Sequence, residues 1–235
     1  MKPVPPIDSV YYEKVTIQES NEFSGGMEGC QVYLNTHDPT NQCKFYRWEY
    51  SETWEFHFPE PYRPKNIICW VSNNSNEINI KNTSSFVESR INRYPLNFIS
   101  NLTDRLRIKY SILVNQYSLN EDEYLYWEKL QNIFEQVGGL YDMIPSGIPS
   151  NVYCLNDPNE KVLGYFSVSA KSSKRIFIKD HFAGVITPYT DDACIIIKWV
   201  IIGNTSVKEI IIIKECIDCT VRGTNMAPDF WTEGK

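Results

Sequence analysis

The stretch FYRWEYSETWEFHF, residues 45–58, decides the fold class of this chain. Apart from Glu52 its even positions are aromatic, and after Phe45 its odd positions are polar or charged. A period of two is typical of a β-strand with one buried and one solvated face. Fourteen residues is long for a strand, so we expect a break or bulge near Ser51–Glu52.

Shorter runs separated by turn residues predict further strands on both sides of this stretch. They are Val10–Gln18, Gln31–Asn35, Asn66–Val71, Glu77–Ile80, Arg105–Gln116, Val152–Leu155, Gly164–Ala170 and Arg175–Ile178. Two later runs, Cys194–Ile202 and Glu209–Glu215, are almost continuously apolar. Such runs are typical of central strands covered on both faces, so we place them in the middle of a sheet.

One helix interrupts the strands. Ser118 and Glu121 have the spacing of a capping box, in which each side chain accepts from the other residue's amide. Trp127, Leu130 and Phe134 follow at helical spacing, and Gly138–Gly139 ends the pattern. The sequence predicts an amphipathic helix over about residues 119–137 that packs on the sheet. Four side chains of the long strand are expected to form the core beneath it: Tyr46, Trp48, Trp54 and Phe56.

Together these elements predict a mainly β fold, an antiparallel β-sandwich-like domain with one inserted amphipathic helix. At 235 residues the chain fits a single β-rich domain, residues 1–235. The proline-rich start, MKPVPPIDSVYY, carries no apolar signal-peptide core. We interpret residues 1–8 as the remnant of an interdomain linker.

Composition excludes several classes of function. The net charge of −6 argues against a nucleic-acid partner. No apolar run is long enough to form a transmembrane span, because the longest, Ile195–Ile202, is interrupted by Lys198. The motifs that bind nucleotides or build nucleophile elbows are absent.

Metal and catalytic chemistry find little support in the spacing of the residues. The three histidines, His37, His57 and His181, lie far apart, so the sequence predicts neither a metal site nor a cofactor. Cys216 and Cys219 form a lone CxxC pair, which favours structural disulfides over buried thiols or redox chemistry. We therefore expect a non-catalytic protein. The alternative is a hydrolase of glycans or peptides whose site is assembled from dispersed carboxylates.

Recognition is expected on the loops, which carry function on rigid β scaffolds. Long polar and aromatic connections are predicted at Ser72–Tyr94, Gly138–Asn151 and Lys179–Asp192. Within the last two, Tyr141 and Tyr189 are our candidate binding residues for a sugar or peptide ligand. The alternative is that both rings fold back over the ends of the sandwich.

Several longer motifs occur in the chain in a fixed order. They are FYRWEYSETWEF (45–56), CW (69–70), YPLNFI (94–99), YSILVNQYSLNEDEYLYWEKLQ (110–131), DPNEKVLGYFSVSAKSSKRIFI (157–178) and ECIDCTVRGTNMAPDFW (215–231). Over nearly the whole chain they resemble domain of unknown function 4249, a family of bacterial cell-envelope proteins.

The resemblance implies the C-terminal part of a longer outer-membrane lipoprotein, without its signal and first domain. It also implies a partnership with a TonB-dependent transporter, through ligand capture or docking, and supplies no catalytic residues to carry over. Cys216 and Cys219, with Cys69 as a partner, lie inside the family-like motifs and are the disulfide candidates. An envelope protein of this kind is expected in an oxidising compartment.

Overall fold

The computed structural model describes residues 3–17, 27–57, 68–137, 148, 150–157, 159–160, 162, 164–186, 194–202, 205–212, 216 and 218–231. Among these residues the chain forms ten strands and one α-helix. In chain order they are β1 (Ile7–Ile17), β2 (Met27–Asp38), β3 (Phe45–His57), β4 (Ile68–Asn74), β5 (Asn79–Asn82), β6 (Ser89–Ser100), β7 (Lys109–Leu119), α1 (Glu121–Val137), β8 (Lys171–Ile178), β9 (Ile195–Ile202) and β10 (Thr205–Ile212).

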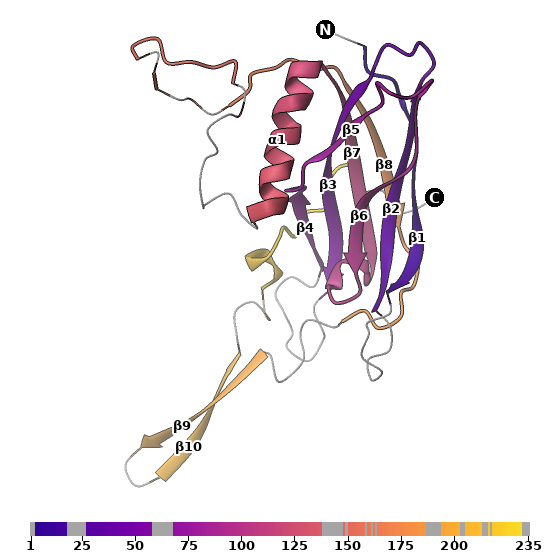
Figure 1. Cartoon of the computed structure of the whole chain (residues 1–235). Helices are drawn as coiled ribbons and strands as arrows, with labels where there is room; N and C mark the ends of the chain where they lie inside the picture. Colours follow the sequence, from indigo (N-terminus) through magenta and orange to yellow (C-terminus); the bar gives the residue numbers. More distant parts are fainter. Residues whose placement is uncertain are drawn as a thin grey trace.

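Two antiparallel sheets face each other (Figure 1). The three-stranded sheet has the order β1-β2-β6, and the large sheet has the order β4-β3-β7-β8 with β5 also paired to β3. A sandwich-like, predominantly antiparallel β fold with one helix is therefore confirmed. Among the described residues, no helix has the length and apolar character needed to cross a membrane.

The long strand β3 is the centre of the large sheet, as its alternation predicts. Its even-numbered residues from Tyr46 to Phe56 are all buried. The break expected near Ser51–Glu52 is wrong, because β3 pairs with β7 in unbroken register from Phe45↔Leu119 to Glu55↔Lys109. Glu52 occupies an inward position without disturbing the register, since its carboxylate accepts hydrogen bonds from Tyr110 and Arg105.

The main core lies between the two sheets. Tyr46, Trp48, Trp54 and Phe56 belong to it together with apolar residues of the three-stranded sheet such as Leu34. The expectation that these four rings lie beneath the helix is therefore wrong. Inward and outward residues alternate along β3, so the helix packs on the opposite face of the large sheet.

Helix α1 forms a second, smaller core on that outward face. Tyr124 packs with Phe45 of β3, Ile80 of β5 and Leu119 of β7. The helix begins two residues later than expected, because Asn120 and not Ser118 caps it: Asn120 Oδ1 accepts from the Glu123 amide at 2.8 Å. Ser118 is still part of β7.

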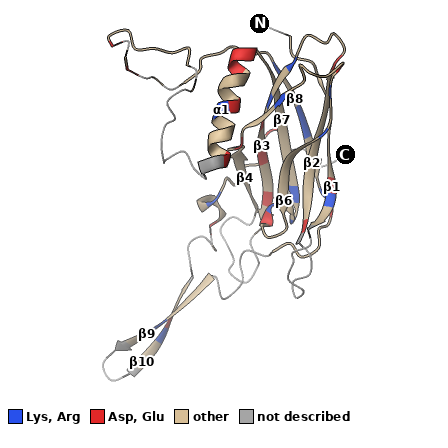
Figure 2. Cartoon of the chain, in the orientation of Figure 1, with Lys and Arg blue, Asp and Glu red and all other residues tan. Residues whose placement is uncertain are grey.

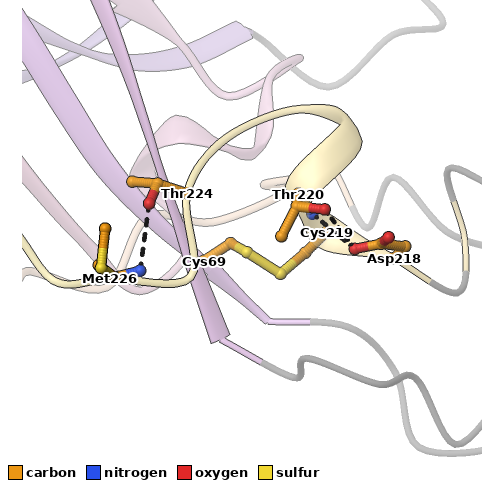
Figure 3. The surroundings of a disulfide bond; sticks show 6 residues. All are labelled: Cys69, Asp218, Cys219, Thr220, Thr224 and Met226. Atoms are coloured by element: carbon orange, nitrogen blue, oxygen red, sulfur yellow. Dashed lines mark hydrogen bonds between the residues drawn. A yellow bond between two sulfur atoms is a disulfide. The ribbon is translucent and has the colours of Figure 1, made fainter.

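A C-terminal segment closes onto the large sheet (Figure 3). A disulfide joins Cys69 of β4 to Cys219, and the backbones of Trp70 and Thr224 exchange two hydrogen bonds beside it, at 2.8 and 2.9 Å. Gly223 is required at this contact, since a Cβ there would lie 2.2 Å from the Trp70 carbonyl oxygen. Trp231 Nε1 then donates to Glu55 on the outward face of β3.

The two apolar runs near the C-terminus are not central strands. Among the described strands, β9 and β10 pair only with each other, and Figure 1 shows this hairpin projecting away from the sandwich. Trp199 is 67% exposed and Ile210 57%. A second disulfide, Cys194–Cys216, joins the two ends of the hairpin. The expectation of burial on both faces is therefore wrong for this pair.

Three further strand predictions differ from the structure. β6 lies where a loop was expected, and Val152–Leu155 and Gly164–Ala170 are not strands. The side chain of Asn151, just before the first of these segments, binds the backbone of the second: it donates to the Phe166 carbonyl at 2.6 Å and accepts from its amide at 2.7 Å. These hydrogen bonds take the place of a strand ladder there.

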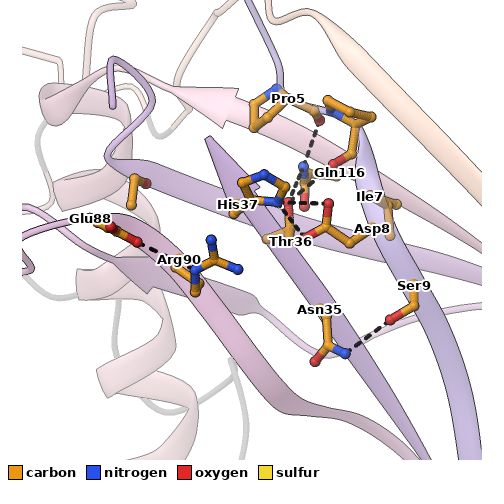
Figure 4. A network of polar contacts seen from close by, with 12 residues as sticks. Pro5, Ile7, Asp8, Ser9, Asn35, Thr36, His37, Glu88, Arg90 and Gln116 are labelled. Atoms are coloured by element: carbon orange, nitrogen blue, oxygen red, sulfur yellow. Dashed lines mark hydrogen bonds and ion pairs between the residues drawn. The ribbon is translucent and has the colours of Figure 1, made fainter. Parts of the chain in front are cut away.

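The N-terminal residues are part of the sandwich. Strand β1 begins at Ile7, and Pro5 is buried with its carbonyl accepting from Gln116 Nε2 at 2.8 Å (Figure 4). Gln116 also donates to Thr36 and accepts from Trp48 Nε1. Pro5 and Ile7, which belong to the stretch 1–8 interpreted as a linker remnant, are therefore packed into the sandwich.

Candidate functional site

A hollow of about 400 Å³ lies between α1, the first residues of β3 and the connection from β4 to β5. Its floor comes from β3, one wall from the helix and the other from residues 75–79, and we call it the helix hollow. It is lined by Arg47, Trp48, Glu49, Ser75, Asn76, Glu77, Ile78, Asn79, Tyr126, Trp127, Leu130, Phe134 and Gly164. Gln131 ties the helix to the opposite wall by donating to the Ile78 carbonyl at 2.8 Å.

Arg47 and Trp127 form the boundary of this hollow. Arg47 has an odd number and so points to the outward face of β3, where its guanidinium lies 4.0 Å from the centre of the Trp127 ring. The same guanidinium forms an ion pair with Glu49. A stacked, paired arginine has a fixed position, because the ring and the carboxylate both restrict its rotation.

A second hollow, of about 380 Å³, lies on the other side of this pair. We call it the serine hollow; it is lined by Arg47, Tyr117, Glu123, Trp127, Ser167, Val168 and Ser169. The Ser167 hydroxyl donates to the Glu123 carboxylate at 2.6 Å. Glu123 lies in the acidic first turn of α1 (Figure 2). Burial raises the pKa of Tyr117, and Glu49 raises it further, so its hydroxyl stays neutral.

Two buried hydrogen-bond donors of the helix hollow have no partner. Trp127 Nε1 and Asn79 Nδ2 are both inaccessible and make no hydrogen bond in the part of the chain that is described. A buried donor without an acceptor costs about 1–3 kcal/mol. Trp54 Nε1 and Trp70 Nε1 are also unpartnered but line none of the hollows. What distinguishes Trp127 from these two is that its ring lines a hollow open to solvent, while Nε1 itself is inaccessible as the side chains stand.

A third hollow, of about 460 Å³, is predominantly polar. We call it the asparagine hollow; it is lined by Tyr50, Glu52, Asn73, Asn74, Asn76, Glu77, Asn97, Phe98 and Arg105. Two carboxylates, Glu52 and Glu77, line it. Glu52 is 5% exposed, and its oxygens accept from Arg105 at 3.1 Å and from the Tyr110 hydroxyl at 2.7 Å.

The described part of the chain contains no group of three or more His, Cys, Asp and Glu residues that could hold a metal ion. His37 contacts Asp8, and His57 contacts Glu55 on its own strand. The carboxylate that a hydrolase would use in the asparagine hollow, Glu52, is already occupied by Arg105 and Tyr110.

The structure describes the predicted disulfide candidates but not the predicted binding residues. Tyr141 and Tyr189 lie outside the described residues. Cys69, Cys216 and Cys219 all form disulfides, Cys69 with Cys219 and Cys216 with Cys194.

The three other cysteines, Cys30, Cys43 and Cys154, are free. Burial raises the pKa of the Cys30 thiol to about 12. This thiol is therefore unreactive at neutral pH.

The three hollows were not predicted from the sequence. Trp127 was assigned to the helix face that packs on the sheet, and Arg47 and Glu49 stood out only as part of a motif. One signal was available: an arginine on the solvated face of a strand whose neighbours are aromatic. The pairing of that arginine with a helix placed later in the chain requires the tertiary fold.

Comparison with known proteins gives one match. A family profile with the description "Domain of unknown function (DUF4249)" matches residues 1–175. All residues that line the three hollows fall inside this range, whereas β9, β10 and the C-terminal segment lie beyond it. No curated protein and no solved structure matches the chain.

Proposed function

This chain belongs to the DUF4249 family, and on that premise we propose that it is a non-catalytic cell-envelope protein that captures a ligand in the helix hollow. The captured ligand is passed to, or held near, a TonB-dependent transporter of the outer membrane. The resemblance of the sequence to outer-membrane lipoproteins supports this cellular role, and the hollow supports the binding.

The buried indole N–H of Trp127 carries the proposal. It borders a solvent-connected hollow and has no acceptor in the described chain. Tryptophan N–H groups usually find a partner when they are buried. Nε1 is inaccessible as the side chains stand, so a ligand oxygen would satisfy this donor only after the Trp127 ring turns toward the hollow. The rings of Tyr126 and Phe134 supply apolar surface around it. Such a mixture of apolar walls and few directed polar groups is typical of ligand sites.

The two disulfides support an envelope location. Disulfides persist in oxidising compartments such as the periplasm and the cell surface, and are rare in the cytosol. Cys69–Cys219 and Cys194–Cys216 join positions that are separated by 150 and 22 residues in the sequence. A protein of this kind folds best where thiols are oxidised.

Hydrolysis is the second candidate, because Glu52 and Glu77 line one hollow. Glu52 is a poor general acid or nucleophile, since Arg105 and Tyr110 already engage both of its oxygens. A binding protein returns its ligand unchanged, whereas a hydrolase shortens it. Mass spectrometry of the ligand before and after prolonged incubation separates the two candidates.

The proposal is tested with immobilised protein and a soluble envelope extract. We expect a compound to be retained, recovered chemically unchanged, and lost when Trp127→Phe removes the N–H but keeps an aromatic ring. The affinity should fall about tenfold, which corresponds to one hydrogen bond of about 1.4 kcal/mol. Trp70→Phe is the matched control, because it removes an unpartnered indole N–H outside the three hollows.

Two results would contradict the proposal: equal retention by wild type and Trp127→Phe, or recovery of cleaved products. The transporter partnership has its own test. After mild solubilisation of outer membranes, the protein should co-purify with a TonB-dependent receptor, and co-purification should survive Trp127→Phe if docking and ligand capture use separate surfaces. If the wild-type protein co-purifies with no TonB-dependent receptor, the partnership is refuted.

A further inference from the structure

The three hollows form one track. The serine hollow and the helix hollow share Arg47 and Trp127, and the helix hollow and the asparagine hollow share Asn76 and Glu77. The first two hollows lie on the outward face of β3, whereas Tyr50 and Glu52 place the asparagine hollow on the inward face. A ligand can therefore run from Ser167 past the Arg47–Trp127 pair, and it reaches Arg105 by bending round the sheet edge at Asn76 and Glu77. A track of three consecutive hollows suits a linear molecule, whereas a compact one fills a single hollow.

The charges of the track argue against a polyanionic ligand. Its described lining holds four carboxylates, Glu49, Glu52, Glu77 and Glu123, against two arginines. Among its described lining residues the only cations are Arg47 and Arg105. Arg47 is paired with Glu49, and Arg105 with Glu52. A polyanion needs uncompensated cations along its path, as nucleic acids and other phosphate chains do. Here each guanidinium is neutralised by a carboxylate of the same chain.

The polar side chains of the track suit hydroxyl groups. Amides dominate the end of the track beyond the helix hollow: Asn73, Asn74, Asn76 and Asn97. An amide both donates and accepts, and a hydroxyl does the same, so each can satisfy the other. The Trp127 Nε1 donor adds one position that needs an acceptor once the ring turns to expose it. A peptide would instead need apolar pockets for alternate side chains or a free strand edge, and the asparagine hollow is predominantly polar.

From these observations we propose that the ligand is a linear oligosaccharide of neutral sugars, bound along the track from the serine hollow to the asparagine hollow. The rings of Tyr126 and Phe134 pack against the apolar C–H faces of the sugars. The asparagine side chains and the Trp127 indole N–H bind ring and hydroxyl oxygens. This inference rests on the proposed function and names the class of its ligand.

The test is a glycan array of neutral linear oligosaccharides, followed by isothermal titration calorimetry with the best-binding series from disaccharide to hexasaccharide. We expect the affinity to rise at least about tenfold along the series, because longer chains reach a further hollow. Asn76→Ala, at the junction of two hollows, should weaken hexasaccharide binding about tenfold. Asn156→Ala is the matched control, since this exposed asparagine lines none of the three hollows.

The outcomes separate the ligand class from the proposed function. If no neutral oligosaccharide binds, or if disaccharide and hexasaccharide bind equally, the glycan inference is overturned. A parallel library of short neutral peptides provides the other arm: peptide binding that is lost in Trp127→Phe overturns the glycan class but leaves ligand capture intact. If neither library binds and the envelope extract yields no retained compound, both proposals fail.

Discussion

Removal of the Cys69–Cys219 disulfide should destabilise the domain more than removal of Cys194–Cys216. The two bonds close loops of 150 and 22 residues. Loop-closure entropy then gives about 5 kcal/mol for the first bond and about 3 kcal/mol for the second. The smaller loop lies inside the larger one and shortens it by 22 residues, which changes the larger value by only about 0.1 kcal/mol.

The comparison uses two double variants, Cys69→Ala with Cys219→Ala, and Cys194→Ala with Cys216→Ala. Each removes two buried thiol side chains, so their difference of about 2 kcal/mol reports on loop length. Equilibrium urea unfolding of oxidised protein, followed by tryptophan fluorescence, measures the free energy of unfolding of each. Equal costs, or a larger cost for the 22-residue loop, would refute the reasoning.

Two further changes test local contacts. Burial raises the pKa of Asp38, but hydrogen bonds from the Cys43 amide and from Thr40 outweigh burial, so the pKa is lowered. The contribution of this carboxylate to stability is therefore present above pH about 4, and it is lost as the pH falls through the lowered pKa. Asp38→Asn should lower the free energy of unfolding by about 1–2 kcal/mol at pH about 7 and by progressively less in acid. Urea unfolding of variant and wild type at neutral and at acidic pH measures this, and the same difference between the two proteins at each pH would contradict the prediction. Asn120→Ala should cost about 1 kcal/mol through the lost helix cap, whereas an unchanged urea midpoint would mean that Glu123 does not depend on this acceptor.

The sequence predicted best where side-chain alternation and burial agree. The even-numbered aromatics of β3 are buried because one strand face meets the three-stranded sheet. The same alternation could not say which face the helix covers, since both faces of β3 are partly apolar at Phe45 and Tyr46. The position of α1 depends on where β5 and β7 place Ile80 and Leu119.

β6 could not be predicted because its pairing is irregular. Its register with β2 shifts twice, between Val32 and Tyr33 and between Leu34 and Thr36. Arg93 has a φ of 55° within the strand, and Pro95 provides no amide donor. Each irregularity moves the next side chain to the other face, so no period of two survives in the sequence.

The apolar hairpin was misjudged for a different reason. A strand covered on both faces and a strand exposed on both faces can have the same apolar composition. Pairing decides between them, and β9 pairs only with β10 among the described strands. The candidate site was missed because it joins Arg47 of β3 to Trp127 of α1, which are 80 positions apart in the chain.

The Cys194–Cys216 bond also changes how the chain tolerates damage. The bond provides a second covalent path around β9 and β10, so a protease that cuts between these strands does not release the residues that follow. The C-terminal segment with Trp231 would stay attached through Cys216 and, independently, through Cys219 to β4. The exposed apolar hairpin can thus be cleaved, or shortened or replaced during evolution, while the two disulfides keep the C-terminal segment attached to the sandwich.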